Sequence, residues 1–258
     1  MAISTDWQGN LGNLTFGAGT DWQIDAPGIT GLGIPTARTR DAERGAGHGD
    51  VGGDDVLPRR ILTVPLVGFF ATPGDAWTAF ETDLKVAWAE SIVDEALDLR
   101  LPGMPTTGRR FYGRPRGVDE DLADLKSSTI RGLCTFEALD PFGYGDEEFE
   151  TGSGTFDVVN AGTASTDRVV LTITGNGGAP KIVNANDDGG DVTFAETLAG
   201  GAVRVVDLRA HTITDAGGTD AYDELAPGTL WTVLHPGTNS LTLTGAASVD
   251  VAFRPAFR

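Results

Sequence analysis

The C-terminal part of the chain consists of short β-branched and apolar runs that turn signals separate at regular intervals. Gly-Gly, Asp-Gly and Pro-Gly pairs lie between the runs, and no segment has the 3.6-residue periodicity of a helix. Short strands with evenly spaced turns are typical of an antiparallel β-sandwich. The runs that we expect to form strands are residues 168–174, 180–185, 191–198, 203–208, 211–217, 229–234, 240–245 and 249–255.

The N-terminal part predicts a second sheet. Residues 59–70 form an apolar, β-branched run that indicates a buried strand. Residues 93–101 and 128–139 alternate between apolar and polar side chains, as strands with one buried face do. Residues 109–125 predict a further strand with a charged, turn-rich edge. In this pattern Cys134 points into a sheet face, where it is expected to be a small buried hydrophobe.

The strongest helix signal covers residues 73–90. Thr72 can accept the N-cap hydrogen bond, Pro73 occupies the first helical position, where its missing N–H costs nothing, and Asp75 follows in the first turn. We expect the apolar face of this helix to pack on the sheet, because buried aromatic side chains usually belong to a core. That face carries Trp77, Phe80, Leu84, Ala87 and Trp88 at helical spacing.

The two patterns meet at residues 140–156, where Pro, Gly, Ser and acidic residues interrupt the alternation. A chain of 258 residues is long enough for two ordinary domains. We therefore predict a mainly β protein with two domains. Residues 1–147 form a β-sheet or split-barrel domain with one packed helix, and residues 148–258 form the sandwich.

The composition excludes several classes of protein. The chain has 19 Lys and Arg residues against 37 Asp and Glu residues, a net charge of −18, and no basic patch that could neutralise nucleic-acid phosphates. Its single cysteine excludes an intrachain disulfide framework and a thiolate metal cluster. The longest apolar run, residues 61–71, is far shorter than the roughly 20 residues of a membrane span, and no secretion signal precedes it. We expect a soluble protein made in a cytoplasm.

No motif predicts catalysis or a cofactor. Gly47, Gly49 and Gly52 form a G-x-G-x-x-G, but a polar run precedes it and a strand follows it, whereas a dinucleotide site needs a strand and then a helix. Residues 184–191 partly imitate a calcium loop, but the glutamate of the twelfth position is missing, so a hairpin turn is the better interpretation. The three histidines are far apart in the sequence. We expect no catalytic, cofactor-binding or metal-binding residue.

Several stretches nevertheless resemble one family. Residues 28–67 resemble the start of the siphophage distal tail protein (Dit) family, in which a Gly- and Arg-containing "HG" segment leads into an "R-x-L-x-x-P" strand. The helix "DAWTAFETDLKVAWA", the junction "FEALDPFGYG" and the ending from "LWTVLHPG" to "FRPAFR" resemble that family's helix, domain junction and final strands in the same order. The resemblance covers essentially the whole chain.

The resemblance implies a structural virion protein at the distal end of the phage tail, made in the host cytoplasm, and not an enzyme. The N-terminal domains of a homohexamer would form a ring, and a galectin-like C-terminal sandwich would point outwards. The implied partners are the major tail tube protein above and the tail-tip hub protein below, with the tape measure protein as a further candidate. DNA would pass through the lumen without specific binding, helped by acidic residues if these line it. No membrane insertion, metal or cofactor is implied.

Residues 38–60 are then expected to be an extended β-arm whose polar groups pair with neighbouring subunits. Gly45, Gly47 and Gly49 would let its backbone bend. The competing interpretation is a surface loop without fixed structure, since glycine-rich polar runs often have none. The candidate inter-subunit residues of the arm are Arg38, Arg40, Arg44, His48, Asp50, Arg59 and Arg60.

Two other functions stay open. The chain could be a carbohydrate-binding β-sandwich protein for host-surface attachment, which would need an exposed aromatic platform or polar cluster. Trp231 and Tyr222 are the only Trp or Tyr beyond residue 148, and Trp231 lies in an apolar run that predicts a core position. A hydrolase would need a histidine or carboxylate constellation that only coordinates can show.

Overall fold

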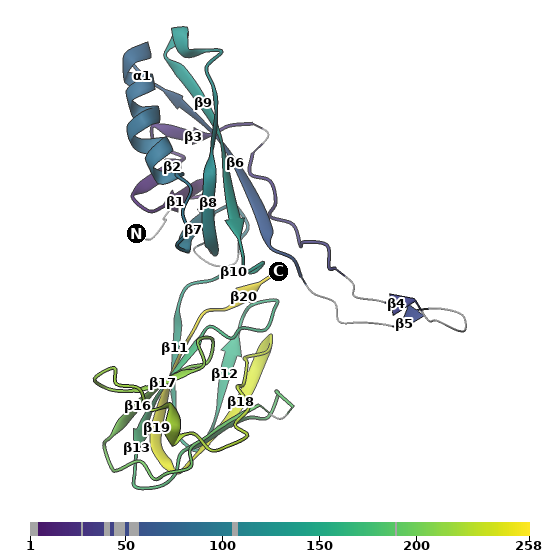
Figure 1. Cartoon of the computed structure of the whole chain (residues 1–258), viewed down its shortest axis with the longest axis vertical. Helices are drawn as coiled ribbons and strands as arrows, with labels where there is room; N and C mark the ends of the chain where they lie inside the picture. The colour runs from purple at the N-terminus through teal and green to yellow at the C-terminus, as the bar shows by residue number, and fades with distance from the viewer. Residues whose placement is uncertain are drawn as a thin grey trace. The chain divides into compact units, whose positions relative to one another are not determined.

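The computed structural model describes residues 5–26, 28–38, 42–43, 50–51, 57–104, 108–188 and 190–258. The chain divides into two compact units, Met1–Gly143 together with Arg258, and Tyr144–Phe257 (Figure 1). Within these residues most regular structure is strand, and one helical segment longer than a single turn lies in the first unit, so the predicted mainly β fold is confirmed. None of the described helices is long and apolar enough to cross a membrane.

The first unit is built on one antiparallel sheet with the strand order β2-β1-β7-β8-β9-β6-β3. The two end strands of this order, β2 and β3, lie next to each other, so the sheet nearly closes into a barrel. The strands are β1 (Gln8–Leu11), β2 (Leu14–Gly17), β3 (Trp22–Ile24), β6 (Arg60–Phe69), β7 (Glu95–Arg100), β8 (Arg109–Asp121) and β9 (Thr129–Ala138).

The long pair β6 and β9 carries the core of this unit. Arg60 lies opposite Ala138 at one end of the pair, and Phe69 lies opposite Thr129 at the other. Cys134 is fully buried as expected, and burial raises the pKa of its thiol, which keeps the thiol protonated and unreactive. The inward residues of the two strands are Leu62, Val64, Leu66, Ile130, Cys134 and Phe136.

The predicted helix begins where its capping residues indicate. Thr72 Oγ1 accepts a hydrogen bond from the Asp75 N–H at 3.1 Å, and Pro73 is the first helical residue. The helix contains one π-helical turn and ends at Ala87, three residues earlier than predicted. Its consecutive parts are α1 (Pro73–Ala79), η1 (Phe80–Leu84) and α2 (Lys85–Ala87).

The apolar face of the helix packs on the sheet through Phe80, Leu84 and Trp88, which are fully buried. Trp77 was expected on the same face but is 39% exposed. It lies at the edge of the stripe, where its ring stacks on Phe80 with the centroids 5.9 Å apart. The pattern therefore predicts the buried face correctly except for its first member.

The second unit is a sandwich of two antiparallel sheets. One sheet has the order β11-β19-β13-β16-β17 and the other β12-β18-β14-β15. The strands are β11 (Glu148–Gly152), β12 (Thr155–Asn160), β13 (Val169–Gly175), β14 (Lys181–Asn184), β15 (Asp191–Thr193), β16 (Val203–Asp207), β17 (Thr212–Asp215), β18 (Gly237–Thr244) and β19 (Ala246–Phe253).

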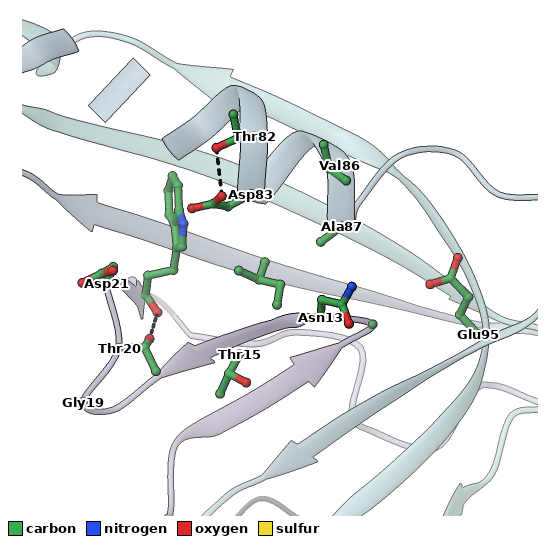
Figure 2. A pocket seen from close by; sticks show the side chains of 13 residues that line it. Asn13, Thr15, Gly19, Thr20, Asp21, Thr82, Asp83, Val86, Ala87 and Glu95 are labelled. Atoms are coloured by element: carbon green, nitrogen blue, oxygen red, sulfur yellow. Dashed lines mark hydrogen bonds between the residues drawn. The ribbon is translucent and has the colours of Figure 1, made fainter. Parts of the chain in front are cut away.

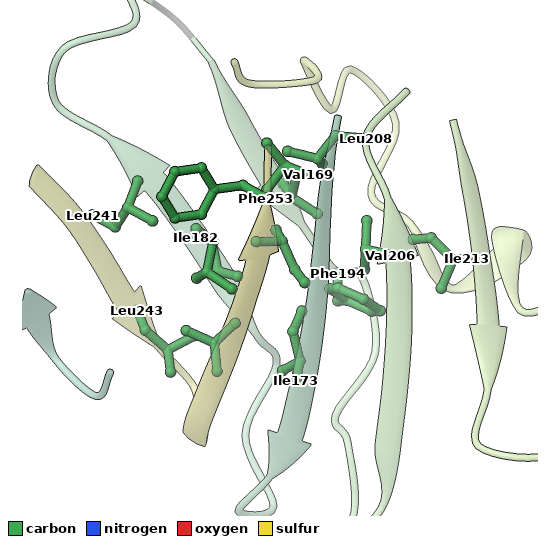
Figure 3. Close-up of a cluster of buried hydrophobic side chains, with 14 of the residues drawn as sticks. Val169, Ile173, Ile182, Phe194, Val206, Leu208, Ile213, Leu241, Leu243 and Phe253 are labelled. Carbon is green, nitrogen blue, oxygen red and sulfur yellow. The ribbon is translucent and has the colours of Figure 1, made fainter. Parts of the chain in front are cut away.

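Alternate residues of both sheets meet in one core (Figure 3). Ile173 and Val206 come from one sheet, and Ile182 and Leu243 come from the other; all four side chains are buried. Each such side chain contributes roughly 1.5–3 kcal/mol by leaving water. The core therefore accounts for the spacing of apolar residues that the sequence shows.

One predicted strand is absent from the described residues. Residues 229–234 were expected to form it, but Leu230 and Leu234 make only isolated bridges, to Asp191 and Thr166 respectively. The two ends of the segment thus pair with different neighbours, which prevents a continuous ladder. The short elements of the chain are β4 (Ala42–Glu43), β5 (Asp50–Val51), β10 (Gly143–Tyr144), which pairs with β20 (Ala256–Phe257), η2 (Leu125–Ser127) and η3 (Tyr222–Glu224).

Candidate assembly surface

The predicted arm contains a pair of short strands. In the described backbone, Ala42 of β4 lies opposite Val51 of β5 and Glu43 lies opposite Asp50, so the chain reverses between them. These two strands form a sheet of their own within the described residues. Of the candidate residues, Arg38 is exposed and Asp50 lies in β5. Three further candidates lie outside the described residues: Arg40, Arg44 and His48. The proposed hinges Gly45, Gly47 and Gly49 lie outside them as well.

Arg59 has a partner within its own chain. Its guanidinium pairs with the carboxylate of Glu137, whose side chain is only 9% exposed. Arg116 Nε donates to the other oxygen of the same carboxylate at 2.6 Å. A nearly buried carboxylate is thus held between two guanidiniums, which is the arrangement that keeps a buried charge compensated.

Arg60 lies inside the first unit. Its side chain is 4% exposed, and the guanidinium carbon lies 5.4 Å from the centroid of the Phe111 ring. Among the described residues, its Nε and Nη2 find no hydrogen-bond acceptor. Burial lowers the pKa of Arg60, and the negative charge of Asp140 acts in the opposite direction. A neighbouring subunit cannot reach this guanidinium unless covering residues move.

The outward face of β6 and β9 carries exposed large apolar side chains among its threonine and charged residues. Ile61 is 51% exposed, Phe69 is 62% exposed and Leu133 is 45% exposed. Pro65 lies directly opposite Leu133, so the two side chains share this face. These side chains follow the length of β6 from Ile61 to Phe69, and exposed apolar surface of this kind can mark an interaction site on a soluble protein. We call Ile61, Pro65, Phe69 and Leu133 the apolar stripe. It was not predicted from the sequence, although the alternation of β6 and β9 places these residues on the outward face.

An open groove of about 700 Å³ lies beside the helix (Figure 2). The β1–β2 turn with Asn13, the loop before β3 and the helical residues Thr82 and Asp83 line it. Carboxylates at Asp21, Asp83 and Glu95 make its rim acidic, which disfavours phosphate ligands. No nucleophile paired with a base is among the described residues that line the groove.

The calcium-like turn of residues 184–191 uses its oxygens within the protein. Asp187 accepts hydrogen bonds from Thr232 and Val233, and Asn186 accepts one from the Ser240 N–H. Gly189 lies outside the described residues. Within the described part of the chain, no group of three or more His, Cys, Asp or Glu side chains could hold a metal ion.

Comparisons with known proteins bear on both units. Residues 161–257 match the family model described as the siphovirus-type tail component, C-terminal domain. No curated protein matches the chain. The Dit protein of phage SPP1 is similar in structure, with 17% identity, a TM-score of 0.71, and coverage of 90% of this chain and 93% of that chain. A chain of the activated phage P2 baseplate with Ca is similar at 9% identity, a TM-score of 0.55, and coverage of 96% and 97%.

The family model covers most of the second unit, and the fold agreement with the SPP1 protein extends over 90% of the chain. The family model supports the resemblance over residues 161–257, and the solved structures show that the fold agrees over most of the chain. The predicted resemblance to the siphophage distal tail protein family is therefore confirmed.

Proposed function

We propose that this protein is a distal tail protein. Six copies form a ring that joins the tail tube to the tail-tip hub, and DNA passes through the lumen of the ring. The observation that carries the proposal is the agreement of fold with the SPP1 Dit protein at a TM-score of 0.71. The SPP1 protein is described as a paradigm of the hub adsorption apparatus in phages that infect Gram-positive bacteria. The partners are the tube protein, the hub protein and, as a further candidate, the tape measure protein.

Two features of the first unit suit a closed ring. The apolar stripe offers a surface that loses contact with water when a neighbouring copy covers it. The arm, with Arg38, Arg40 and Arg44, offers charges for the opposite side of a heterologous contact. A net charge of −18 for each copy would keep DNA from adhering to the lumen if acidic residues line it.

The test is the mass of the purified protein by light scattering, combined with negative-stain images of the same sample. We expect rings with six times the 26.9 kDa of one chain, or stacked pairs of them. Deleting residues 43–54 should weaken the ring while leaving the second unit folded. A protein that stays monomeric even when it is produced together with its tube and hub proteins would refute the proposal.

One observation favours the carbohydrate-binding alternative. Trp231 was expected in the core, but it is only partly buried and stacks on the exposed His211 ring at 4.7 Å between centroids, with Tyr222 6.4 Å away on η3. Tyr222 is 49% exposed. Flat aromatic surfaces of this kind can hold the apolar face of a sugar ring. Binding of the protein to a glycan array that Tyr222→Ala abolishes would support this function, and an array without signal would exclude it.

A further inference from the structure

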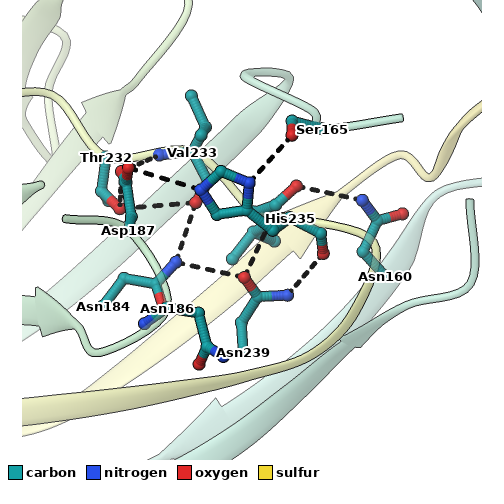
Figure 4. A network of polar contacts seen from close by, with 10 residues as sticks. Asn160, Ser165, Asn184, Asn186, Asp187, Thr232, Val233, His235 and Asn239 are labelled. Carbon is teal, nitrogen blue, oxygen red and sulfur yellow. Dashed lines mark hydrogen bonds and ion pairs between the residues drawn. The ribbon is translucent and has the colours of Figure 1, made fainter. Parts of the chain in front are cut away.

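Three side chains that no motif connects meet in the second unit (Figure 4). Ser165 lies between β12 and β13, Asp187 follows β14, and His235 precedes β18. Ser165 Oγ is 3.0 Å from Nδ1 of His235, and Nε2 of His235 is 3.4 Å from Oδ1 of Asp187. Figure 4 shows the imidazole between the hydroxyl and the carboxylate. The order of groups is that of a nucleophile, a base and an orienting acid.

The hydrogen bonds decide which group carries each proton. Burial acts to raise the pKa of Asp187, but hydrogen bonds from the Val233 N–H, the Thr232 hydroxyl and His235 hold that pKa below its ordinary value. The carboxylate is therefore ionised at neutral pH and can only accept, so the proton of a neutral imidazole resides on Nε2. Nδ1 is then the acceptor, and the Ser165 hydroxyl must donate to it.

Buried amides hold the two loops that carry Ser165 and His235. Asn160 is fully buried and donates to the carbonyls of Ala164 and Leu234, each at 3.0 Å, which are the residues directly before Ser165 and His235. Asn239, also fully buried, accepts from the His235 N–H and donates to the His235 carbonyl, both at 2.8 Å. The serine and the imidazole are thus fixed relative to each other before any ligand binds.

The serine and the imidazole are open to solvent. The side chain of His235 is 40% exposed, and that of Asp187, which orients it, is 20% exposed. Ser165 is itself partly exposed. No described residue accepts a hydrogen bond from the Ser165 N–H. This N–H can therefore donate to an oxyanion that forms beside its own hydroxyl, as the amide of a catalytic serine can do.

We propose that Ser165, His235 and Asp187 form an acyl-transfer site that cleaves carboxylic esters reaching the open surface of the second unit. Ser165 Oγ attacks the carbonyl carbon while its proton moves to Nδ1 of His235. The C–O bond of the ester then breaks, and the leaving alcohol takes that proton. Water attacks the acyl-serine, gives a proton to His235 and releases the carboxylic acid, while Ser165 regains its proton. This activity goes beyond the structural role and does not depend on ring formation.

The test uses the full-length protein and a fluorophosphonate probe. Ser165 Oγ should displace fluoride from phosphorus and become phosphonylated, and peptide mass spectrometry should locate the adduct on Ser165. Ser165→Ala should remove the label with little effect on the fold, because among the described residues its side chain bonds only to His235. Ser248→Ala, which removes another partly exposed hydroxyl of the same unit, is the matched control and should keep the label.

Two further variants test the roles of the partners. His235→Phe keeps a ring but removes both nitrogens, and Asp187→Asn keeps the shape but removes the charge. We expect each to slow labelling at least about tenfold, the scale on which proton transfer contributes. Wild type and Ser248→Ala should hydrolyse p-nitrophenyl acetate faster than Ser165→Ala does. No adduct on Ser165 of the folded wild type, or labelling that is as fast in His235→Phe, would overturn the proposal.

Discussion

Replacing Arg60 is expected to stabilise the protein, whereas most substitutions of buried residues destabilise it. The reason is that Arg60 is buried with unsatisfied nitrogens. The residue is 4% exposed, and two of its guanidinium nitrogens find no acceptor among the described residues. Each unsatisfied buried donor costs about 1–3 kcal/mol. The cation–π contact with the Phe111 ring stabilises the buried guanidinium by about 1–2 kcal/mol. Arg60→Met keeps the length and apolar stem of the side chain, so it should stabilise the first unit by about 1–4 kcal/mol.

The neighbouring residue supplies the control. Arg59 has a side chain that is 58% exposed and pairs with Glu137. Arg59→Met loses that ion pair without relieving any buried donor, but Arg116 still pairs with Glu137. Because the Arg59 side chain is mostly exposed, the loss should destabilise the unit by only up to about 1 kcal/mol. Two adjacent substitutions of the same chemistry are thus expected to have opposite signs.

The assay is urea unfolding followed by tryptophan fluorescence. Four of the five tryptophans, at positions 7, 22, 77 and 88, lie in the first unit, so the signal reports mainly on that unit. We expect the midpoint of Arg60→Met to rise by roughly 1 M with an unchanged slope. If Arg60→Met instead lowers the midpoint as much as Arg59→Met does, the guanidinium is satisfied in solution and the reasoning from its burial is wrong.

Three further outcomes are expected. Ile61→Lys combined with Leu133→Lys should reduce the mass of the assembly in light scattering without lowering monomer stability, whereas Leu122→Lys, at a residue 41% exposed outside the stripe, should leave the mass unchanged. Asn160→Ala should destabilise the second unit by about 2–4 kcal/mol in calorimetry, because it leaves two loop carbonyls without their donor. Folding lowers the pKa of Asp187, so its contribution to stability is present above its unfolded pKa near 3.8 and is lost as the pH falls through its folded pKa. Acid unfolding should therefore show a loss of stability in the wild type over this range that Asp187→Asn does not show.

The sequence predicted the elements whose periodicity is long and regular. The strands of both sheets and the capped helix follow from alternation and from Thr72 with Pro73, because local side-chain direction alone decides them. Even Arg60 could have been placed correctly: counting back by two from the buried Leu62 puts residue 60 on the inward side of β6. Its charge obscured that signal, since charged residues are almost never fully buried without a partner.

Other features could not be predicted because they depend on which loops meet. Ser165 and His235 are 70 positions apart, and Asp187 and His235 are 48 apart. Their contact depends on the strand order of the two sheets, which a single sequence with many similar short strands does not specify. Trp231 packs against the core as expected but stays partly exposed, and the apolar run around it bridges to two different neighbours instead of forming the predicted strand.

The proposed assembly surface and the proposed reactive serine rest on different features in different units, so each can be tested without the other. In the first unit the unusual feature is apolar exposure at Ile61, Phe69 and Leu133, which has a physical reason only if another surface covers it. In the second unit the unusual feature is polar burial: Asn160 and Asn239 are fully buried, and their hydrogen bonds rigidify loops that end in exposed groups. A stripe variant that fails to assemble should therefore still label at Ser165, and a Ser165→Ala variant should still form rings. If either change abolished both properties, the assembly surface and the reactive serine would have to be explained as one structure.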